Sequence, residues 1–233
     1  MDGLEEAVAG RRIINSNSYA LAAGVRAAGG DARLLGIARD DAADLRARLA
    51  GAMDADVLIT TAGASVGDHD LVKDVLQQLG MDVLFWRVQM RPGSPFSFGL
   101  IRRDGQAPMP VFGLPGNPVS AVVTFELLVR PALRRMQGRL AVYPPTQRVR
   151  LAEAVESKPG MTHFLRATLD RSGSFPLARL TGAQGSGILT SVARADALLV
   201  VPLDVERIGE GEEAVAVLLG SGDEAEGELF RAG

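Results

Sequence analysis

Apolar and polar positions alternate between strand-like and helix-like patterns over the first 142 residues. Leu71, Val72, Val75, Leu76 and Leu79 have the spacing of one helix face, and Gly80 follows them as a helix end. The pattern predicts helices at 18–28, 41–50, 71–79 and 119–136. It predicts strands at 12–14, 32–37, 57–60, 83–88, 96–101 and 109–112, with a hairpin turn at 103–105. Strands that alternate with helices favour a three-layer α/β/α domain with a mainly parallel sheet over residues 1–142.

The pattern changes at Tyr143-Pro144-Pro145, which we interpret as a linker. Helical spacing then gives way to short apolar strands separated by Gly or Pro. These strands are expected at 149–155, 162–169, 175–180, 197–202 and 214–219. They indicate a small all-β domain of the barrel type over residues 146–220. The Gly- and Glu-rich residues 221–233 are expected to form a flexible tail.

Composition removes several classes of function. The chain is 47% hydrophobic and 23% charged, with a formal net charge of -3, so no overall charge attracts it to nucleic acid or an anionic membrane. It has no cysteine, which excludes disulfides and a thiol nucleophile. The sequence shows neither the apolar core of a signal peptide nor an apolar run long enough to span a membrane. We therefore expect a cytoplasmic protein without a nucleic-acid or membrane partner.

Residues 113–120 read G-L-P-G-N-P-V-S and form the most informative motif. They follow the strand at 109–112 and precede the apolar helix at 119–136. Pro118 suits the first helical position because the N–H that it lacks has no partner there, and Asn117 before it is a favoured N-cap. The motif predicts a rigid turn that leads into a helix N-terminus, where exposed N–H groups favour an anion.

A second loop, residues 60–70, follows the strand at 57–60. Its small residues allow a ligand to approach the backbone, and successive N–H groups could form an anion-binding nest. Either Asp68 or Asp70 can cap the next helix, and the other carboxylate is then available for a hard cation such as Mg2+. The alternative is an ordinary strand–helix connection.

A third candidate segment lies where the strand at 83–88 ends. Arg87, Gln89 and Arg91 share one face of an extended chain, and arginine presents a donor fork that matches phosphate oxygens. The alternative is a solvated basic edge. All three segments follow strands, and open α/β sheets bind ligands at the carboxyl ends of their strands. Together they predict a pocket for a phosphorylated, anionic ligand.

These segments also carry a family resemblance. Residues 61–70, T-A-G-A-S-V-G-D-H-D, are similar to the T-G-G-x-S-x-G-x-x-D signature of molybdopterin-binding domains. Residues 90–95 resemble the K-P-G-x-P segment, and residues 113–121 resemble the G-L-P-G-N-P-V-S-A segment of the MoeA/gephyrin family. The resemblance extends from about Arg12 to Leu219 and implies a molybdopterin molybdotransferase. Such enzymes hydrolyse adenylylated molybdopterin and insert molybdate with Mg2+ to complete the molybdenum cofactor.

The resemblance implies roles for individual residues. Asp70 would lie near the metal and a phosphate, as a metal ligand and catalytic residue. Arg87 and Arg91 would take the catalytic positions where the family usually has lysines facing the anionic ligand. The implied molybdopterin-binding positions are Asn15, Thr61, Gly63, Ser65, Gly67, Asp68, Pro115, Gly116, Asn117, Pro118, Ser120, Arg166 and Ser186.

The chain departs from the family pattern in three ways. Asn15 stands where the family often has Asp or Glu, and Ala62 replaces a glycine. Two N-terminal domains of full-length members have no counterpart, so the chain is a fragment, a shortened paralogue, or the partner of a separate polypeptide that carries them. The resemblance also implies a homo-oligomer.

Two other functions remain open at this point. One is a non-catalytic molybdopterin-binding or scaffold protein. The other is a molybdopterin adenylyltransferase of the MogA type, which uses the same α/β domain alone. The turn at 113–118 and the additional β domain favour the MoeA type over the MogA type.

Overall fold

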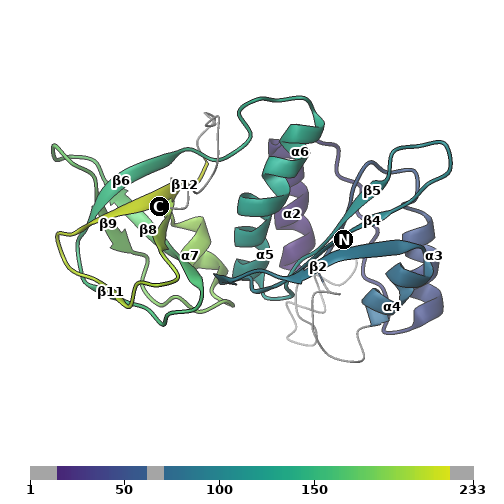
Figure 1. The fold of residues 1–233 in the computed structure, drawn as a ribbon, viewed down its shortest axis with the longest axis horizontal. Coiled ribbons are helices and arrows are strands. Elements are labelled where there is room, and N and C mark those ends of the chain that lie inside the picture. The colour runs from purple at the N-terminus through teal and green to yellow at the C-terminus, as the bar shows by residue number, and fades with distance from the viewer. Residues whose placement is uncertain (1–14, 62–70, 221–233) are drawn as a thin grey trace, which may run out of the picture.

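The computed structural model describes residues 15–61 and 71–220, which form two lobes side by side (Figure 1). We call residues 15–142 the α/β lobe and residues 146–220 the β lobe. The α/β lobe holds a four-stranded sheet in the order β1-β5-β4-β2. Its strands are β1 (Leu58–Thr60), β2 (Met81–Arg87), β4 (Pro95–Ile101) and β5 (Met109–Gly113).

Helices pack on both faces of this sheet. On one face, α3 (Ala42–Ala50) and α4 (Leu71–Gln78) bury leucine and valine side chains against Leu58, Val111 and Ile101. On the other face, α2 (Ser16–Ala27) and the long helix after β5 pack on Phe96 and Phe112. The helix at 41–50 is confirmed, and Asp41 caps it by accepting a hydrogen bond from the Asp44 amide at 2.9 Å.

The expectation of a mainly parallel sheet is wrong for the strand pairing, which is mixed. Among the described strands of this sheet, only β1 and β5 pair in parallel, whereas β4 runs antiparallel to both β5 and β2. The cause is local. The hairpin turn at Arg103 joins β4 to β5, and the short turn between β2 and β4, which includes the Val88 N–H to Ser94 carbonyl bond, reverses the chain again. Because β4 alone is reversed, β1, β5 and β2 all point in one direction.

The strand expected at 32–37 is also wrong, because these residues form no strand. Gly36 has φ +79°, which interrupts an extended chain. Leu34 and Ile37 are 50% and 67% exposed, so the apolar alternation there does not mark a buried face. The strand expected at 12–14 lies outside the described residues.

The helix predicted at 119–136 is continuous but contains a wide turn. It consists of α5 (Pro118–Thr124), the π-helical turn η1 (Phe125–Val129) and α6 (Arg130–Met136). The Arg130 N–H donates to the Phe125 carbonyl, five residues back, just before Pro131, which has no N–H to donate. The same turn pairs the half-buried Glu126 with Arg130 at 2.7 Å.

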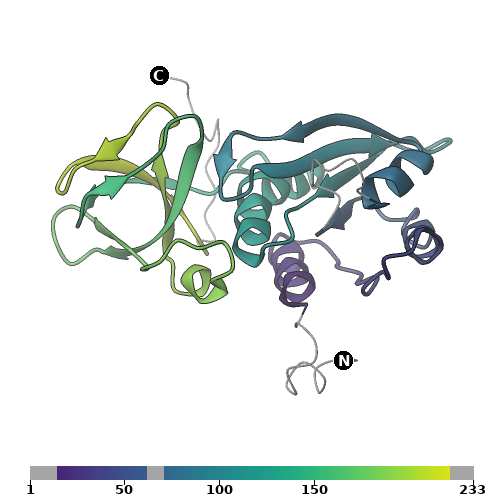
Figure 2. The ribbon, with the colours of Figure 1, turned by 90° about the horizontal axis from the view of Figure 1, so that it is seen from below.

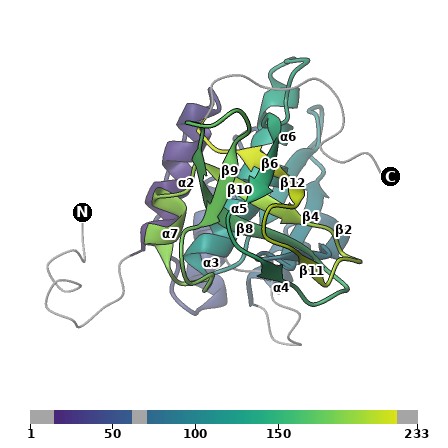
Figure 3. The same ribbon diagram turned by 90° about the vertical axis from the view of Figure 1, so that its left-hand side faces the viewer.

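The β lobe is a small closed sheet with one short helix, α7 (Leu189–Ala193), and Figure 3 looks onto it. Five strands pair in the order β10-β12-β6-β9-β8, and β8 pairs back with β10. These five strands are β6 (Thr146–Leu151), β8 (Thr162–Asp170), β9 (Leu177–Leu180), β10 (Ala197–Val201) and β12 (Glu213–Leu218), and β7 (Val155–Glu156) pairs separately with β11 (Arg207–Ile208). No described helix is long and apolar enough to cross a membrane.

The two lobes share a core. The short strand β3 (Met90–Arg91) leaves the α/β lobe and pairs in parallel with β8. Met90, Val119 and Val123 pack with Phe164 and Leu198 of the β lobe in one buried cluster. The junction is therefore built like a protein interior.

Candidate functional site

Three strand ends meet at one edge of the α/β sheet. The register pairs Thr60 of β1 with Gly113 of β5, and it pairs Arg87 of β2 with Pro95 of β4. Ser97 of β4 pairs with Gly113, which places all of these ends on the same side. The expectation that these segments share an edge is confirmed for the described residues. We call this edge the rim.

The turn after β5 is fastened to its neighbours by backbone hydrogen bonds. The Leu114 N–H donates to the Thr60 carbonyl at 2.8 Å, which continues the β1–β5 pairing beyond both strands. Thr61 follows directly, and its carbonyl oxygen lies 3.7 Å from the position that a Cβ on Gly116 would take. The end of β1 and the turn therefore form one continuous wall.

The start of α5 differs in one detail from the sequence prediction. Asn117 occupies the N-cap position with extended dihedrals (φ -67°, ψ 128°), and Pro118 follows as the first helical residue. The Asn117 side chain, however, makes no capping hydrogen bond. It is exposed at the rim, whereas Pro115 and Ser120 are buried. The amide side chain is thus free of the capping task that the sequence suggested.

Arg87, Gln89 and Arg91 are all at least partly exposed, as expected for residues on one face of an extended segment. Neither arginine forms an ion pair with an acidic residue in the described ranges. Arg91 is fixed in position because β3 pairs with β8, and the Thr162 N–H donates to the Gln89 carbonyl at 2.9 Å. This segment supplies positive charge to the rim.

The turn that follows Arg91 rests directly on α5. Gly93 has φ +108°, and a Cβ on it would lie 2.4 Å from the Cγ2 methyl of Thr124. Thr124 is fully buried, and its hydroxyl donates to the Ser120 and Ala121 carbonyls. Gly93 therefore permits a close approach that fixes the arginine segment against the helix that begins at the rim.

The β lobe also reaches the rim. The Ser186 carbonyl accepts a hydrogen bond from the Val119 N–H of α5 at 3.1 Å, and Figure 2 shows the short helix α7 beside α5. Arg166 on β8 is 1% exposed and donates to the Gly185 carbonyl at 3.2 Å and to the Ser191 hydroxyl at 3.1 Å. Burial lowers the pKa of this guanidinium. The buried Arg166 side chain thus fixes the 184–186 turn to β8 through the Gly185 carbonyl.

The first turn of α2 completes the described part of the rim. Asn15 caps this helix: its Oδ1 accepts from the Ser18 N–H at 3.2 Å, and its Nδ2 donates to the Ser18 hydroxyl at 2.7 Å. Two positions along, the Nδ2 of Asn17 donates to the Gly116 carbonyl at 2.7 Å. Sequence reasoning missed Asn17, and only its position two residues after Asn15 could have pointed to it.

Several candidate residues lie outside the described residues, namely Gly63, Ser65, Gly67, Asp68 and Asp70. Among the described residues, no group of three His, Asp or Glu side chains could hold a metal ion. The described part of the rim therefore offers amide, hydroxyl and guanidinium groups.

His163 lies beneath the arginine segment, opposite Arg91 in the β3–β8 register, and is 9% exposed. Burial and the nearby Arg91 charge lower its pKa below the ordinary value of 6.5. Since the unfolded chain then takes up this proton more readily than the native protein, the free energy of unfolding should fall as pH drops through 6.5.

Urea denaturation between about pH 7.5 and about pH 5.5 brackets that ordinary pKa and checks this expectation. The loss of stability at the acidic end should be smaller in His163→Gln than in the parent protein. Identical pH profiles for the two proteins would contradict the assignment.

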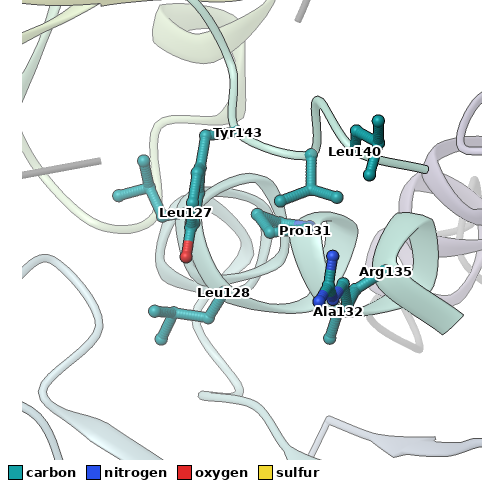
Figure 4. Close-up of a pocket in the computed structure, with 8 residues that line it drawn as sticks. Leu127, Leu128, Pro131, Ala132, Arg135, Leu140 and Tyr143 are labelled. Atoms are coloured by element: carbon teal, nitrogen blue, oxygen red, sulfur yellow. The ribbon is translucent and has the colours of Figure 1, made fainter. Parts of the chain in front are cut away.

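One groove in the described residues lies away from the rim. It encloses about 630 Å3 between the η1–α6 helix and the linker, and Leu127, Pro131, Leu140 and Tyr143 line it (Figure 4). Arg135 is its charged lining residue. The groove is lined mainly by apolar side chains, and so it does not match the anionic ligand that the rim residues indicate.

Two family models match the chain. A model described as a probable molybdopterin binding domain matches residues 5–135, and the MoeA C-terminal region (domain IV) matches residues 148–219. Molybdopterin molybdenumtransferase 1 of Mycobacterium tuberculosis is 37% identical over 208 residues, which is 86% of this chain and 48% of that protein. The molybdopterin molybdenumtransferase of Nostoc sp. is 32% identical over 212 residues, which is 89% of this chain and 48% of that protein.

A solved structure gives the same correspondence. The crystal structure of the molybdopterin biosynthesis moeA protein from Pyrococcus horikoshii OT3 superposes with a TM-score of 0.71 at 28% identity. The match covers 94% of this chain and 50% of that one. The chain thus spans about half the length of the curated relatives that it matches.

Proposed function

Because the chain belongs to the MoeA family, whose molybdopterin-binding and C-terminal regions it contains, we propose that it binds molybdopterin or adenylylated molybdopterin at the rim. In this proposal it takes part in the transfer of molybdenum to that ligand. Molybdate is the second substrate, and Mg2+ assists the step. The activity needs the other half of the relatives' length, in the same chain or on a partner.

The observation that carries the proposal is the meeting of three strand ends with two exposed arginines. Arg87 ends β2 at the same edge as the Pro115–Pro118 turn, and Arg91 follows it four residues later on β3. No acidic residue in 15–61 or 71–220 forms an ion pair with either arginine. Arginine binds phosphate and other oxyanions through paired N–H donors. The phosphate of molybdopterin, or the diphosphate of its adenylylated form, is the ligand group that suits this pair.

The remaining rim residues have complementary roles in the proposal. Asn15, Thr61, Gly116 and Asn117 would supply small polar groups at the rim, where a ligand can approach the backbone. Pro115 and Pro118 keep that wall rigid, while Ser120 lies behind it and Ser186 holds the start of α5.

The metal ion requires residues beyond the described ones. The described rim lacks a carboxylate group that fits Mg2+, and Asp68 and Asp70 belong to the segment outside the described residues. We propose Asp70 as the metal ligand from the family resemblance. Mg2+ bound there would neutralise negative charge on the ligand phosphates. Binding and orientation by the arginines do not depend on this assignment.

Titration of the purified chain with molybdopterin tests the proposal. We expect saturable binding, and we expect Arg87→Ala combined with Arg91→Ala to weaken it at least about 100-fold, since each lost charged hydrogen bond contributes about 1.5–3 kcal/mol. Arg91→Lys should retain part of the affinity because it keeps the charge and loses the planar fork.

Arg148→Ala is the matched control, because Arg148 is a strand arginine in the β lobe whose side chain is 80% exposed. Its affinity should equal that of the parent protein. Absence of binding by the parent chain at micromolar concentrations would refute the proposal. Binding without molybdenum transfer, when the other half of the relatives' length is supplied as well, would favour a non-catalytic binding protein. ATP-dependent adenylylation would favour the MogA type.

A further inference from the structure

We propose that Asn17 is a positioning residue of the rim, which orients the Gly116–Asn117 peptide toward the ligand through its hydrogen bond to the Gly116 carbonyl. This inference rests on the proposed function for the identity of the ligand. The hydrogen bond itself links residues 99 positions apart in the sequence, with 2.7 Å between Nδ2 and the carbonyl oxygen.

The helix does not need Asn17 for its own stability. Asn15 already caps α2 through its contacts with Ser18, so the second helical residue has no capping task. Asparagine is a poor helix-forming residue because its side chain competes for backbone hydrogen bonds. Its presence here is better explained by the contact with the turn than by helix formation.

The Asn17 side chain also lowers the stability of the fold. The Oδ1 of Asn17 is buried, and no residue in the described ranges donates a hydrogen bond to it. An unpaired buried acceptor lowers stability. The opposite amide orientation would place Oδ1 against the Gly116 carbonyl oxygen, and two acceptors would then repel each other. The donor is thus the part of the side chain that the turn uses.

The bond acts on the ligand side through peptide geometry. A trans peptide is planar, and its C=O and N–H point in opposite directions. Holding the Gly116 carbonyl toward α2 therefore turns the Asn117 N–H away from α2. That N–H makes no hydrogen bond to another described residue. The Asn117 side chain makes no capping hydrogen bond to α5 either. Both groups are available to a ligand in an orientation that Asn17 sets.

The test compares Asn17→Ala and Asn17→Asp with the parent protein. Asn17→Asp keeps the size and loses the NH2 donor, and Asn17→Ala shows that any effect is not due to added charge. We expect both variants to bind molybdopterin at least tenfold more weakly, with melting temperatures within a few degrees of the parent. Ser16→Ala is the matched control from the same helical turn, and it should bind like the parent.

The amide NMR signal of Asn117 in the free protein provides a readout that needs no ligand. It should shift in both Asn17 variants and stay in place in Ser16→Ala, even if the parent chain were found not to bind molybdopterin. Shifted Asn117 signals together with no molybdopterin binding by the parent chain would refute the proposed function and support the positioning role. Unchanged Asn117 signals in the Asn17 variants, or parent-like affinity with shifted signals, would overturn the inference. If Asn17→Ala fails to fold, Asn17→Asp supplies both measurements.

Discussion

Gly93→Ala should destabilise the protein by about 3 kcal/mol, the sum of backbone strain at a positive φ of about 1–2 kcal/mol and overpacking of about 1–3 kcal/mol. The added methyl would lie 2.4 Å from the Thr124 Cγ2. Thr124 cannot swing away at low cost, because its hydroxyl is bonded to two carbonyls of α5. Chemical denaturation of parent and variant gives the difference.

Two further variants separate the contribution of backbone strain from that of overpacking. Gly105→Ala is the control, since Gly105 also has a positive φ, +68°, but a Cβ there would meet nothing within 4 Å, so this variant should lose only about 1–2 kcal/mol. Thr124→Ser removes the clashing methyl, so Gly93→Ala should cost less in that background. Equal losses for Gly93→Ala and Gly105→Ala would contradict the close packing on α5.

Arg166→Met is expected to reduce molybdopterin affinity about 100-fold while changing the unfolding free energy by less than about 2 kcal/mol. The buried guanidinium has no carboxylate partner in the described ranges, and so methionine removes a desolvation cost. Methionine also leaves the Gly185 carbonyl without its donor. The 184–186 turn would then be held to β8 mainly through the Gln184 side chain, which bonds to the backbone of residue 166, and the contact of Ser186 with the Val119 N–H at the start of α5 should weaken.

Ser191→Ala tests the same argument at a neighbouring contact. It removes the acceptor for Arg166 Nε but leaves the bond from Arg166 to Gly185, so affinity should fall only a few-fold. Calorimetric titration of both variants measures the difference. Parent-like affinity in Arg166→Met would show that the rim does not depend on this turn.

Local patterns predicted most of the elements. The helices near 18–28, 41–50 and 71–79 and the hairpin of β4 and β5 were found within a few residues, because each has its own period and end signal. The turn at 113–118 was placed correctly between strand and helix for the same reason. The family assignment followed from motifs that are contiguous in the chain.

The errors and omissions have a different origin. The direction of β4 is set by the hairpin to β5 and by the turn after Arg87, and the alternation of strands and helices does not reveal this reversal. The apolar alternation at 32–37 was misleading because Gly36 breaks the extended chain. The contacts of Arg166 and Asn17 and the β3–β8 pairing join distant segments, which no local pattern encodes.

The buried cluster between the lobes has a consequence for how the rim can work. Parting the lobes would expose Val119, Phe164 and Leu198 to water, at a cost that grows with the apolar area uncovered. The cluster therefore opposes a hinge motion about residues 143–145. A ligand that binds at the rim, as proposed above, would meet a preorganised site, so little of its binding energy would go into closing the two lobes around it.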